Sequence, residues 1–510
     1  MSRSNSLLTH VLCLFLFAAC SFGQISVLTW HYDNARTGAN THETTLTPAN
    51  VKPSLFGKLF TQPVDGIVVA QPLYLPNVSI PGAGVHNVVY VVTMHDTVYA
   101  FDADNNADSN ATPLWQTSLT PLGASTLPGT LQRCNGQTKF TEIGILSTPI
   151  IDPATGIMYV VAKTYENGAA LFRLYGLDVT SGKEKLGGPV VISATFSGLG
   201  TTTTFNSLSH LNRPGLLLLN GNIYLGFGSN GCNWNDQGWI LAYDASTLQQ
   251  KGVFTTEPGK HLASVWQKGA GLSADNAGNI YAEAAEGYFS PGTHFGTSVM
   301  KLAQAGNDLV VADWFAPYNT VALSQQDLDM NNAVLILPDQ SGPHPHLAIA
   351  SGKEGTLYVL DRDNMGEFCS TCTSTDEQIV QELTKITGLQ PFSLVYWNNF
   401  VYSAATASPI KAFSLKDGVL STTPVVQSIS VASGHSPVIS SNGTSNGILW
   451  QINGSNLTAF DAITLKKLYA SASTNGRDTL PLLPHFSNHV QANGKVYVGT
   501  NTSLVVYGLF

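Results

Sequence analysis

The chain has 510 residues, of which 24 are basic and 33 acidic, and its formal net charge is −9. Charged residues make up only 11% of the sequence, far below the roughly 25% of an average soluble domain. An acidic chain without a basic stripe excludes nucleic acid as an expected partner, and the abundance of Gly, Ser, Thr and Asn favours an exported all-β protein.

The first residues, MSRSNSLLTHVLCLFLFAACSFGQ, are typical of a secretory signal peptide. A basic residue precedes an apolar run over residues 11–19, which is too short for a comfortable membrane span. We predict a signal peptide over residues 1–23 and a single mature domain over residues 24–510; a lipoprotein cut before Cys20 is the alternative. No later stretch reaches 18 apolar residues, so we expect no transmembrane segment and a periplasmic or extracellular location.

An internal repeat runs through the rest of the chain. Each copy has an apolar run with an aromatic residue, a polar turn, and a second run that ends at aspartate or a substitute, as in VVYVVTMHDTVYAFD. The alternation of apolar and polar residues and the β-branched content predict that each copy is a hairpin of two central strands. The eight copies end at Asp102, Asp178, Asp244, Ala303, Asp361, Ser414, Asp461 and Gly508.

Shorter apolar runs flank most copies, such as STPIID before and GGPVVIS after, and the copies end 47 to 76 residues apart. Four antiparallel strands at this spacing predict an all-β fold, an eight-bladed β-propeller. The last copy leaves no room for an outer strand before Phe510. The run at residues 55–65 supplies that strand most economically and closes the ring. The insertions at 103–144 and 196–210 are expected to be loops.

This fold predicts where residues from distant blades meet. The turn between the second and third strands of a blade leaves on the same face as the link into the next blade, so polar residues there surround one mouth of the channel. A small molecule or a protein is the expected partner at that mouth, although solvated turns also favour such residues. The residues are Gln71, His95, Asp96, His210, Arg213, Asn233, Asp236, Lys268, Glu286, Asp327, Asp329, Lys353, Glu354, His435 and His489.

Four cysteines follow the predicted signal peptide. In an oxidising compartment they predict two disulfides, one closing the small loop between Cys369 and Cys372 and one joining Cys134 to Cys232. A zinc site is the alternative, but the single CxxC has neither a second CxxC nor a histidine pair to complete it.

Three parts of the sequence resemble quinoprotein alcohol dehydrogenases. WHYDNARTGANTHETTLTPANV, followed by FGKLFTQPVDGIVVAQPLY, is similar to the opening of that family. VYAFDA and ILAYDASTL look like its pyrroloquinoline quinone propeller repeats. DLDMNNAVLILPDQ, followed by ASGKEGTLYVLDRDNMG, is similar to the segment that carries the family's catalytic aspartate and a basic residue at the quinone.

The resemblance implies roles for particular residues. Asp329 falls where the family has its general base, and Lys353 falls where it has a quinone-contacting cation. Asn233 and Glu286 fall near two Ca²⁺ ligands with the carboxylate and amide interchanged, so that with Asp329 they form an oxygen-rich candidate calcium site. The residues at the channel mouth that we expect to add cofactor contacts are Arg213 and His95.

The sequence departs from the family at the two faces of the quinone. It has no adjacent cysteines in the mature chain, and QKGAGLSAD lacks the expected Trp, although Trp266 lies just upstream. We therefore predict an exported binding or scaffold protein with a degraded quinone site, similar to the quinone-like outer-membrane assembly lipoproteins. The alternative is a dehydrogenase that uses pyrroloquinoline quinone and Ca²⁺ to oxidise an alcohol or sugar. A hydrolase or lyase, which no motif supports, would use His210, His435 or His489.

Overall fold

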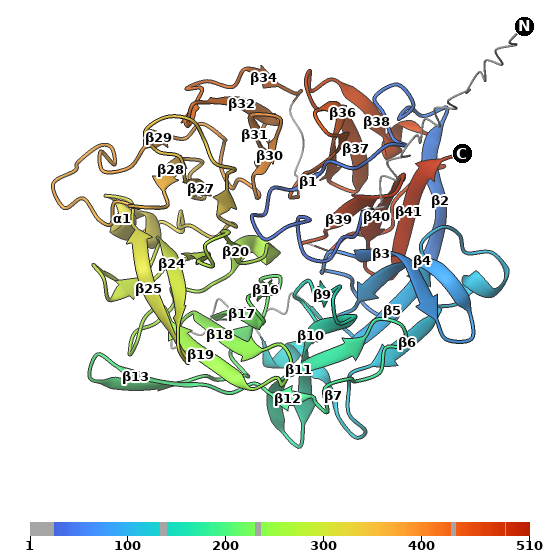
Figure 1. The fold of residues 1–510 in the computed structure, drawn as a ribbon, viewed down its shortest axis with the longest axis horizontal. Coiled ribbons are helices and arrows are strands. Elements are labelled where there is room, and N and C mark those ends of the chain that lie inside the picture. Colours follow the sequence, from blue (N-terminus) through green and yellow to red (C-terminus); the bar gives the residue numbers. More distant parts are fainter. Residues whose placement is uncertain (1–24, 133–139, 230–235, 430–434, 485) are drawn as a thin grey trace, which may run out of the picture.

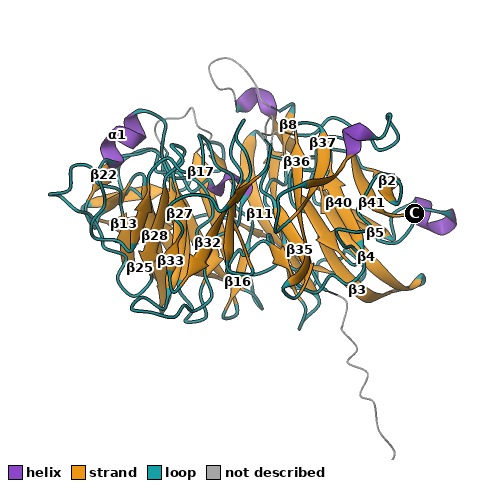
Figure 2. Ribbon diagram, turned by 90° about the horizontal axis from the view of Figure 1, so that it is seen from above, coloured by secondary structure: helices purple, strands orange, loops and turns teal. Residues whose placement is uncertain are grey.

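Eight antiparallel sheets stand around a central channel, which confirms the predicted eight-bladed β-propeller (Figures 1 and 2). Within the described residues the single α-helix is α1 (Thr320–Gln325), and no helix there is long and apolar enough to cross a membrane. The expected signal peptide, with Cys20, lies outside the described part of the chain. The computed structural model describes residues 25–132, 140–229, 236–429, 435–484 and 486–510.

The first four blades follow the chain order, each from its innermost to its outermost strand. Blade 1 consists of β3 (Leu73–Ile80), β4 (Gly84–Val92), β5 (Thr97–Asp102) and β6 (Trp115–Ser118). Blade 2 consists of β9 (Ile150–Asp152), β10 (Ile157–Glu166), β11 (Ala169–Asp178) and β12 (Val190–Val191). Blade 3 consists of β16 (Leu217–Leu219), β17 (Asn222–Ser229), β18 (Trp239–Asp244) and β19 (Gln250–Thr255). Blade 4 consists of β20 (Ser273–Ala274), β21 (Ile280–Ala284), β24 (Ser298–Ala305) and β25 (Asp308–Phe315).

The remaining blades complete the ring. Blade 5 consists of β26 (Leu335–Ile336), β27 (Leu347–Ser351), β28 (Leu357–Asp361) and β29 (Gln381–Leu383). Blade 6 consists of β30 (Val395–Trp397), β31 (Phe400–Ser403), β32 (Lys411–Lys416) and the short β33 (Val419–Leu420) and β34 (Val426–Gln427). Blade 7 consists of β35 (Val438–Asn442), β36 (Ser445–Asn453), β37 (Asn456–Asp461) and β38 (Lys467–Ala470). Blade 8 consists of β39 (His489–Ala492), β40 (Lys495–Gly499), β41 (Ser503–Leu509) and β2 (Phe56–Pro63).

The predicted repeats are the central hairpins of the blades, from β4–β5 to β40–β41. The run expected at residues 55–65 is β2, which pairs antiparallel with β41 over Phe56–Pro63. The two insertions are not loops throughout: β7 (Ser125–Pro128) pairs with β8 (Glu142–Ile143), and β13 (Thr195–Gly198) pairs with β14 (Thr201–Thr204). β7 also pairs with β10, because β10 extends well past the short β9 and leaves an edge to be covered.

The tyrosine and aspartate of the repeat hold adjacent blades together. Tyr90 in blade 1 donates from its hydroxyl to the carbonyl of Val179 in blade 2 at 3.0 Å, one residue after Asp178. The carboxylate of Asp178 in turn accepts from the backbone N–H of Thr180 and fixes that turn. The same tyrosine-to-carbonyl bond joins Tyr159 to Ala245, Tyr402 to Ala462 and Tyr497 to Ala103. The last of these bonds joins blade 8 to blade 1.

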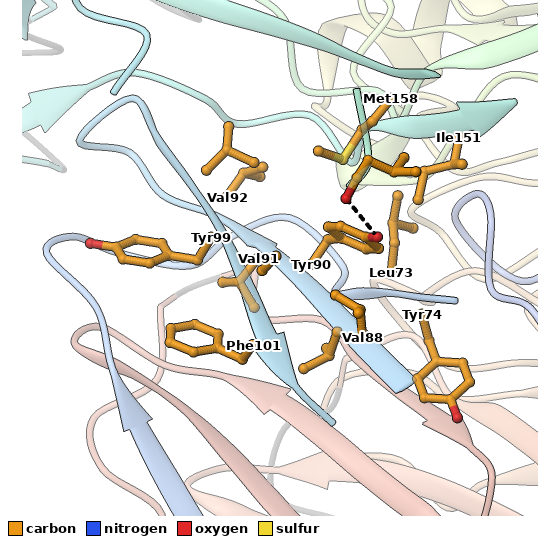
Figure 3. Close-up of a cluster of buried hydrophobic side chains, with 14 of the residues drawn as sticks. Leu73, Tyr74, Val88, Tyr90, Val91, Val92, Tyr99, Phe101, Ile151 and Met158 are labelled. Carbon is orange, nitrogen blue, oxygen red and sulfur yellow. Dashed lines mark hydrogen bonds between the residues drawn. The ribbon is translucent and has the colours of Figure 1, made fainter. Parts of the chain in front are cut away.

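The cores between blades are apolar, as Figure 3 shows for the side chains around Tyr90. Leu73 and Val88 of blade 1 lie next to Ile151 and Met158 of blade 2, and all are at most 1% exposed. Burying side chains of this size contributes roughly 1.5–3 kcal/mol each. The ring is therefore held by a series of similar apolar interfaces and by the tyrosine bonds that cross them.

An N-terminal segment, residues 27–40, runs through the channel and contacts the inner strands in turn; we call it the channel plug. Its backbone bonds Tyr74 in blade 1, and its last residues, β1 (Ala39–Asn40), pair in parallel with β35 in blade 7. Arg36 is its centre: the guanidinium donates to the carbonyls of Trp30, Asp33, Leu216 and Leu272 and to the hydroxyl of Thr29. Gly271 allows this approach, because a Cβ there would lie 2.5 Å from Arg36 Nη2.

Candidate functional site

A cavity of about 740 Å³ opens at one mouth of the channel; we call it the mouth cavity. Some of its lining residues lie a few positions before residues that bond the channel plug. Arg213 lies before Leu216, and Lys268 lies before Leu272. Because an extended chain advances about 3.3 Å per residue, the plug contacts lie further along the channel than the cavity, and none of residues 27–40 is among its lining residues. The loops that surround it belong to the same edge of the ring as β8 and α1 (Figure 2).

One wall of the mouth cavity is apolar. It is built by the loops that enter blades 1, 2, 3 and 8. Five of these six side chains belong to one hydrophobic cluster, so this wall suits the hydrocarbon part of a ligand. The side chains are Val69, Phe140, Ile143, Leu146, Leu211 and Leu483.

The opposite wall, from blades 4 and 5, carries three carboxylates and a lysine. Lys353, in the turn between β27 and β28, donates from Nζ to Asp327 Oδ1 and to Asp329 Oδ1, each at 2.5 Å. Asp329 is fully buried, whereas Asp327 is 78% exposed. Oxygen atoms of Glu286, Asp327 and Asp329 all lie within 4.8 Å of one another. Lys353 is therefore a buried, ion-paired residue of the cavity wall.

Crowding of negative charge changes the protonation of this wall. Burial, and after it the charge of Glu286, raises the pKa of Asp329 to about 7 despite the Lys353 ammonium. Asp329 Oδ2 has no hydrogen-bond donor among the described residues. Burial also raises the pKa of Glu286. Near neutral pH the wall therefore holds an acidic proton that it can give or take.

Arg213 and Lys268 line the same cavity and have no carboxylate partner among the described residues. The guanidinium of Arg213 lies 3.7 Å from the ring centre of Phe486 and 5.1 Å from that of Trp266, and burial lowers its pKa to about 10. Its Nη2 atom is buried and has no hydrogen-bond partner among the described residues. Lys268 donates to the carbonyl of Pro391, and burial lowers its pKa to about 7.

The structure brings together six of the residues expected at the channel mouth. Those that line the cavity are Arg213, Lys268, Glu286, Asp327, Lys353 and His435. Asp329 lies beside them through its bond to Lys353. His95 is not a lining residue; its Nδ1 pairs with Glu142 at 3.0 Å. Asn233, Cys134 and Cys232 lie outside the described residues, while the disulfide between Cys369 and Cys372 is present, as predicted.

Several residues expected at the channel mouth do not line the cavity and instead bond to backbone groups. Both ring nitrogens of His210 face backbone carbonyls, those of Asn206 and Gln237, and His489 Nε2 faces the carbonyl of Trp450. Gln71 bonds the channel plug. The sequence-based search for polar residues missed Phe392 and Phe486, because an aromatic residue in a loop looks the same whether it packs inside a blade or faces a cavity.

Neither a comparison with models of protein families nor one with curated protein sequences finds a match. Solved structures do match. The quinohemoprotein alcohol dehydrogenase from Comamonas testosteroni is 14% identical with a TM-score of 0.63, covering 95% of this chain and 80% of that one. A europium-containing methanol dehydrogenase is 11% identical with a TM-score of 0.59, covering 95% and 98%. A quinohemoprotein alcohol dehydrogenase from Pseudomonas putida HK5 is 13% identical, with a TM-score of 0.58 and coverages of 95% and 80%.

These likenesses confirm the quinoprotein alcohol dehydrogenase fold. The donors at Glu286, Asp327 and Asp329 fit a hard cation such as Ca²⁺, which prefers carboxylate oxygens. The faces of a flat quinone fit less well. The sequence has no adjacent cysteines, and the ring of Trp266, the one tryptophan among the described lining residues, already lies against the Arg213 guanidinium.

Proposed function

We propose that this protein is an exported binding protein and that the mouth cavity holds a small amphipathic organic acid. The observation that carries the proposal is Arg213, which two aromatic rings hold in place while its buried Nη2 keeps a free donor. A carboxylate at the part of the Arg213 guanidinium that lines the cavity would form a charge-assisted hydrogen bond, which is roughly twice as strong as a neutral one. The apolar wall would then take the body of the ligand.

The balance of charge in the cavity supports an acid as the ligand. The Lys353 ammonium offsets one negative charge on the opposite wall, and Asp329 is about half protonated near pH 7. Arg213 and Lys268 have no carboxylate within ion-pair distance among the described residues. The part of the cavity near the Arg213 guanidinium therefore attracts an anion.

Calorimetric titration with a panel of aromatic carboxylates, namely benzoate, phenylacetate and 4-(hydroxymethyl)benzoate, tests this proposal. We expect binding that weakens at least tenfold, about 1.4 kcal/mol, in Arg213→Met. Lys260→Met is the matched control, since Lys260 is an exposed cation over the ring of Tyr288 outside the cavity lining. Absence of binding at millimolar concentration, or equal loss in both variants, contradicts the proposal.

A second candidate is a dehydrogenase that depends on pyrroloquinoline quinone and Ca²⁺, and the carboxylate cluster favours it. Glu286, Asp327 and Asp329 would hold the cation, and Asp329 would accept the proton of an alcohol. The quinone would supply the electron acceptor. Titration with Ca²⁺ and the quinone, followed by a dye-coupled alcohol assay, tests it: turnover lost in Asp329→Asn supports this candidate, and absence of quinone binding rejects it.

Export is part of the proposal. The disulfide between Cys369 and Cys372 supports it, because disulfides persist in oxidising compartments. N-terminal sequencing of the mature protein from the producing cells is the direct measurement. A start at Gln24 fits cleavage of the predicted signal peptide, a lipid-modified start at Cys20 fits a membrane anchor, and an intact N-terminus contradicts export by this route.

A further inference from the structure

The proposed acid-binding role does not use the amine of Lys268, which also lines the mouth cavity. Lys268 and Lys353 both line the cavity, but their surroundings differ. Two carboxylates lie 2.5 Å from Lys353 Nζ. No carboxylate of the described residues lies within ion-pair distance of Lys268, which donates only to the carbonyl of Pro391 and lies 5.4 Å above the ring of Phe392. Lys353 is therefore held as an ammonium, whereas Lys268 lacks the partner that would keep it charged.

The backbone holds Lys268 at this position under strain. Gln267 and Lys268 both adopt left-handed conformations, with φ of 48° and 47°, which non-glycine residues rarely do. Each such residue costs on the order of 1 kcal/mol, and strain of this kind collects at functional sites. The turn directs the lysine into the cavity rather than to solvent, because Lys268 is among the lining residues.

The charges around Lys268 oppose its protonation. Burial is the main cause of its low pKa, and the charges of Lys353 and Arg213 act in the same direction, while those of Glu283 and Asp329 act against it. A desolvated lysine beside another cation is a recognised arrangement for an amine nucleophile. At neutral pH a large fraction of Lys268 is the free amine.

We propose that Lys268 captures aldehydes or ketones that enter the mouth cavity, as a Schiff base. The Nζ lone pair attacks the carbonyl carbon and forms a C–N bond. The carbonyl oxygen then leaves as water with the two amine protons, so no oxidant or reductant is needed and hydrolysis reverses the step. The class of ligand follows from the two walls: an aldehyde with an apolar body and an acid group, the carbonyl at Lys268 and the acid at Arg213. The inference rests on the proposed function, since both use this cavity.

Reductive trapping tests the proposal. The intact protein is incubated at pH 7 with 4-carboxybenzaldehyde and sodium cyanoborohydride, and adducts are counted by intact mass and located by peptide mapping. We expect a first adduct on Lys268, formed at least tenfold faster than on any other lysine and absent from Lys268→Met. Benzaldehyde, which lacks the carboxylate, should react more slowly. Lys260→Met serves as the control that keeps the full rate.

The outcomes separate this inference from the proposed function. Peptide mapping of the unaltered protein needs no variant, so a folding defect in Lys268→Met does not hide the result. Adducts spread evenly over surface lysines, or a first adduct on Lys353, overturn the inference. If 4-(hydroxymethyl)benzoate still binds in that case, the acid-binding function stands without covalent capture; if it does not bind either, both fail.

Discussion

The channel plug and the mouth cavity are neighbouring regions that differ in how their buried polar side chains are hydrogen-bonded. In the plug, Arg36 makes five hydrogen bonds and its guanidinium is used up by carbonyls and one hydroxyl. In the cavity, Arg213 lies between aromatic rings and keeps a buried donor free. A buried polar group whose bonds are all made contributes to folding, whereas one left with a free donor, at a cost in stability, is available to a ligand.

One buried polar side chain of the plug lacks such hydrogen bonds. His31 is buried and stacks on Trp30 with ring centres 3.5 Å apart, and neither of its ring nitrogens has a partner among the described residues. Burial, and then the charge of Arg36, holds the pKa of His31 well below its usual value. Its ring therefore stays neutral at pH 7.

The largest expected effect comes from removing the arginine of the plug. Arg36→Met removes the guanidinium from four backbone carbonyls and the Thr29 hydroxyl inside the channel, and the carbonyls of Trp30 and Leu272 then keep no donor among the described residues. Because an unsatisfied buried acceptor costs about 1–3 kcal/mol, we expect the free energy of unfolding to fall by roughly 5 kcal/mol. Urea unfolding followed by tryptophan fluorescence measures it. A loss under about 1 kcal/mol would show that the plug is not a structural support.

A middle-sized change in the free energy of unfolding is expected from the buried side chain of Glu257. Burial raises the pKa of Glu257 to about 9, so the native state keeps a proton that the unfolded chain releases above about pH 4.5. Stability from this group is therefore present at low pH and is lost as the pH rises from about 4.5 to about 9.

Glu257→Gln tests that pH dependence. Relative to the unaltered protein, the variant should gain stability as the pH is raised from 5 to 8, by roughly 2–4 kcal/mol. Unfolding in urea at a series of pH values measures the difference. Parallel stability curves for the two proteins would mean that Glu257 is ionised in the folded state.

The smallest change in stability is expected at Arg213. Arg213→Met removes a guanidinium that donates no hydrogen bond among the described residues and replaces it with an apolar side chain between Trp266 and Phe486. We expect the free energy of unfolding to stay within about 1 kcal/mol of the unaltered value, while binding of aromatic carboxylates is lost. A large destabilisation, comparable to that of Arg36→Met, would remove the distinction between the two regions.

The eight-bladed ring could be predicted from the amino-acid sequence. In four of the eight repeats the Tyr bonds the carbonyl that follows the closing Asp of the next blade, and the run at 55–65 matches β2 beside β41. These features are local and periodic, so alternation and turn residues reveal them. The same reasoning placed Asp329 and Lys353 on one face, because blade topology decides which turns share an edge.

The tertiary structure alone decided which of those polar residues face the cavity. Lys268 and His489 look alike in sequence as polar residues before an inner strand, yet Lys268 lines the cavity and His489 is buried against Trp450. The apolar lining, with Phe392 and Phe486, gave no signal in the sequence either. Burial and free hydrogen-bond donors arise from packing between segments hundreds of residues apart, and no local pattern encodes them.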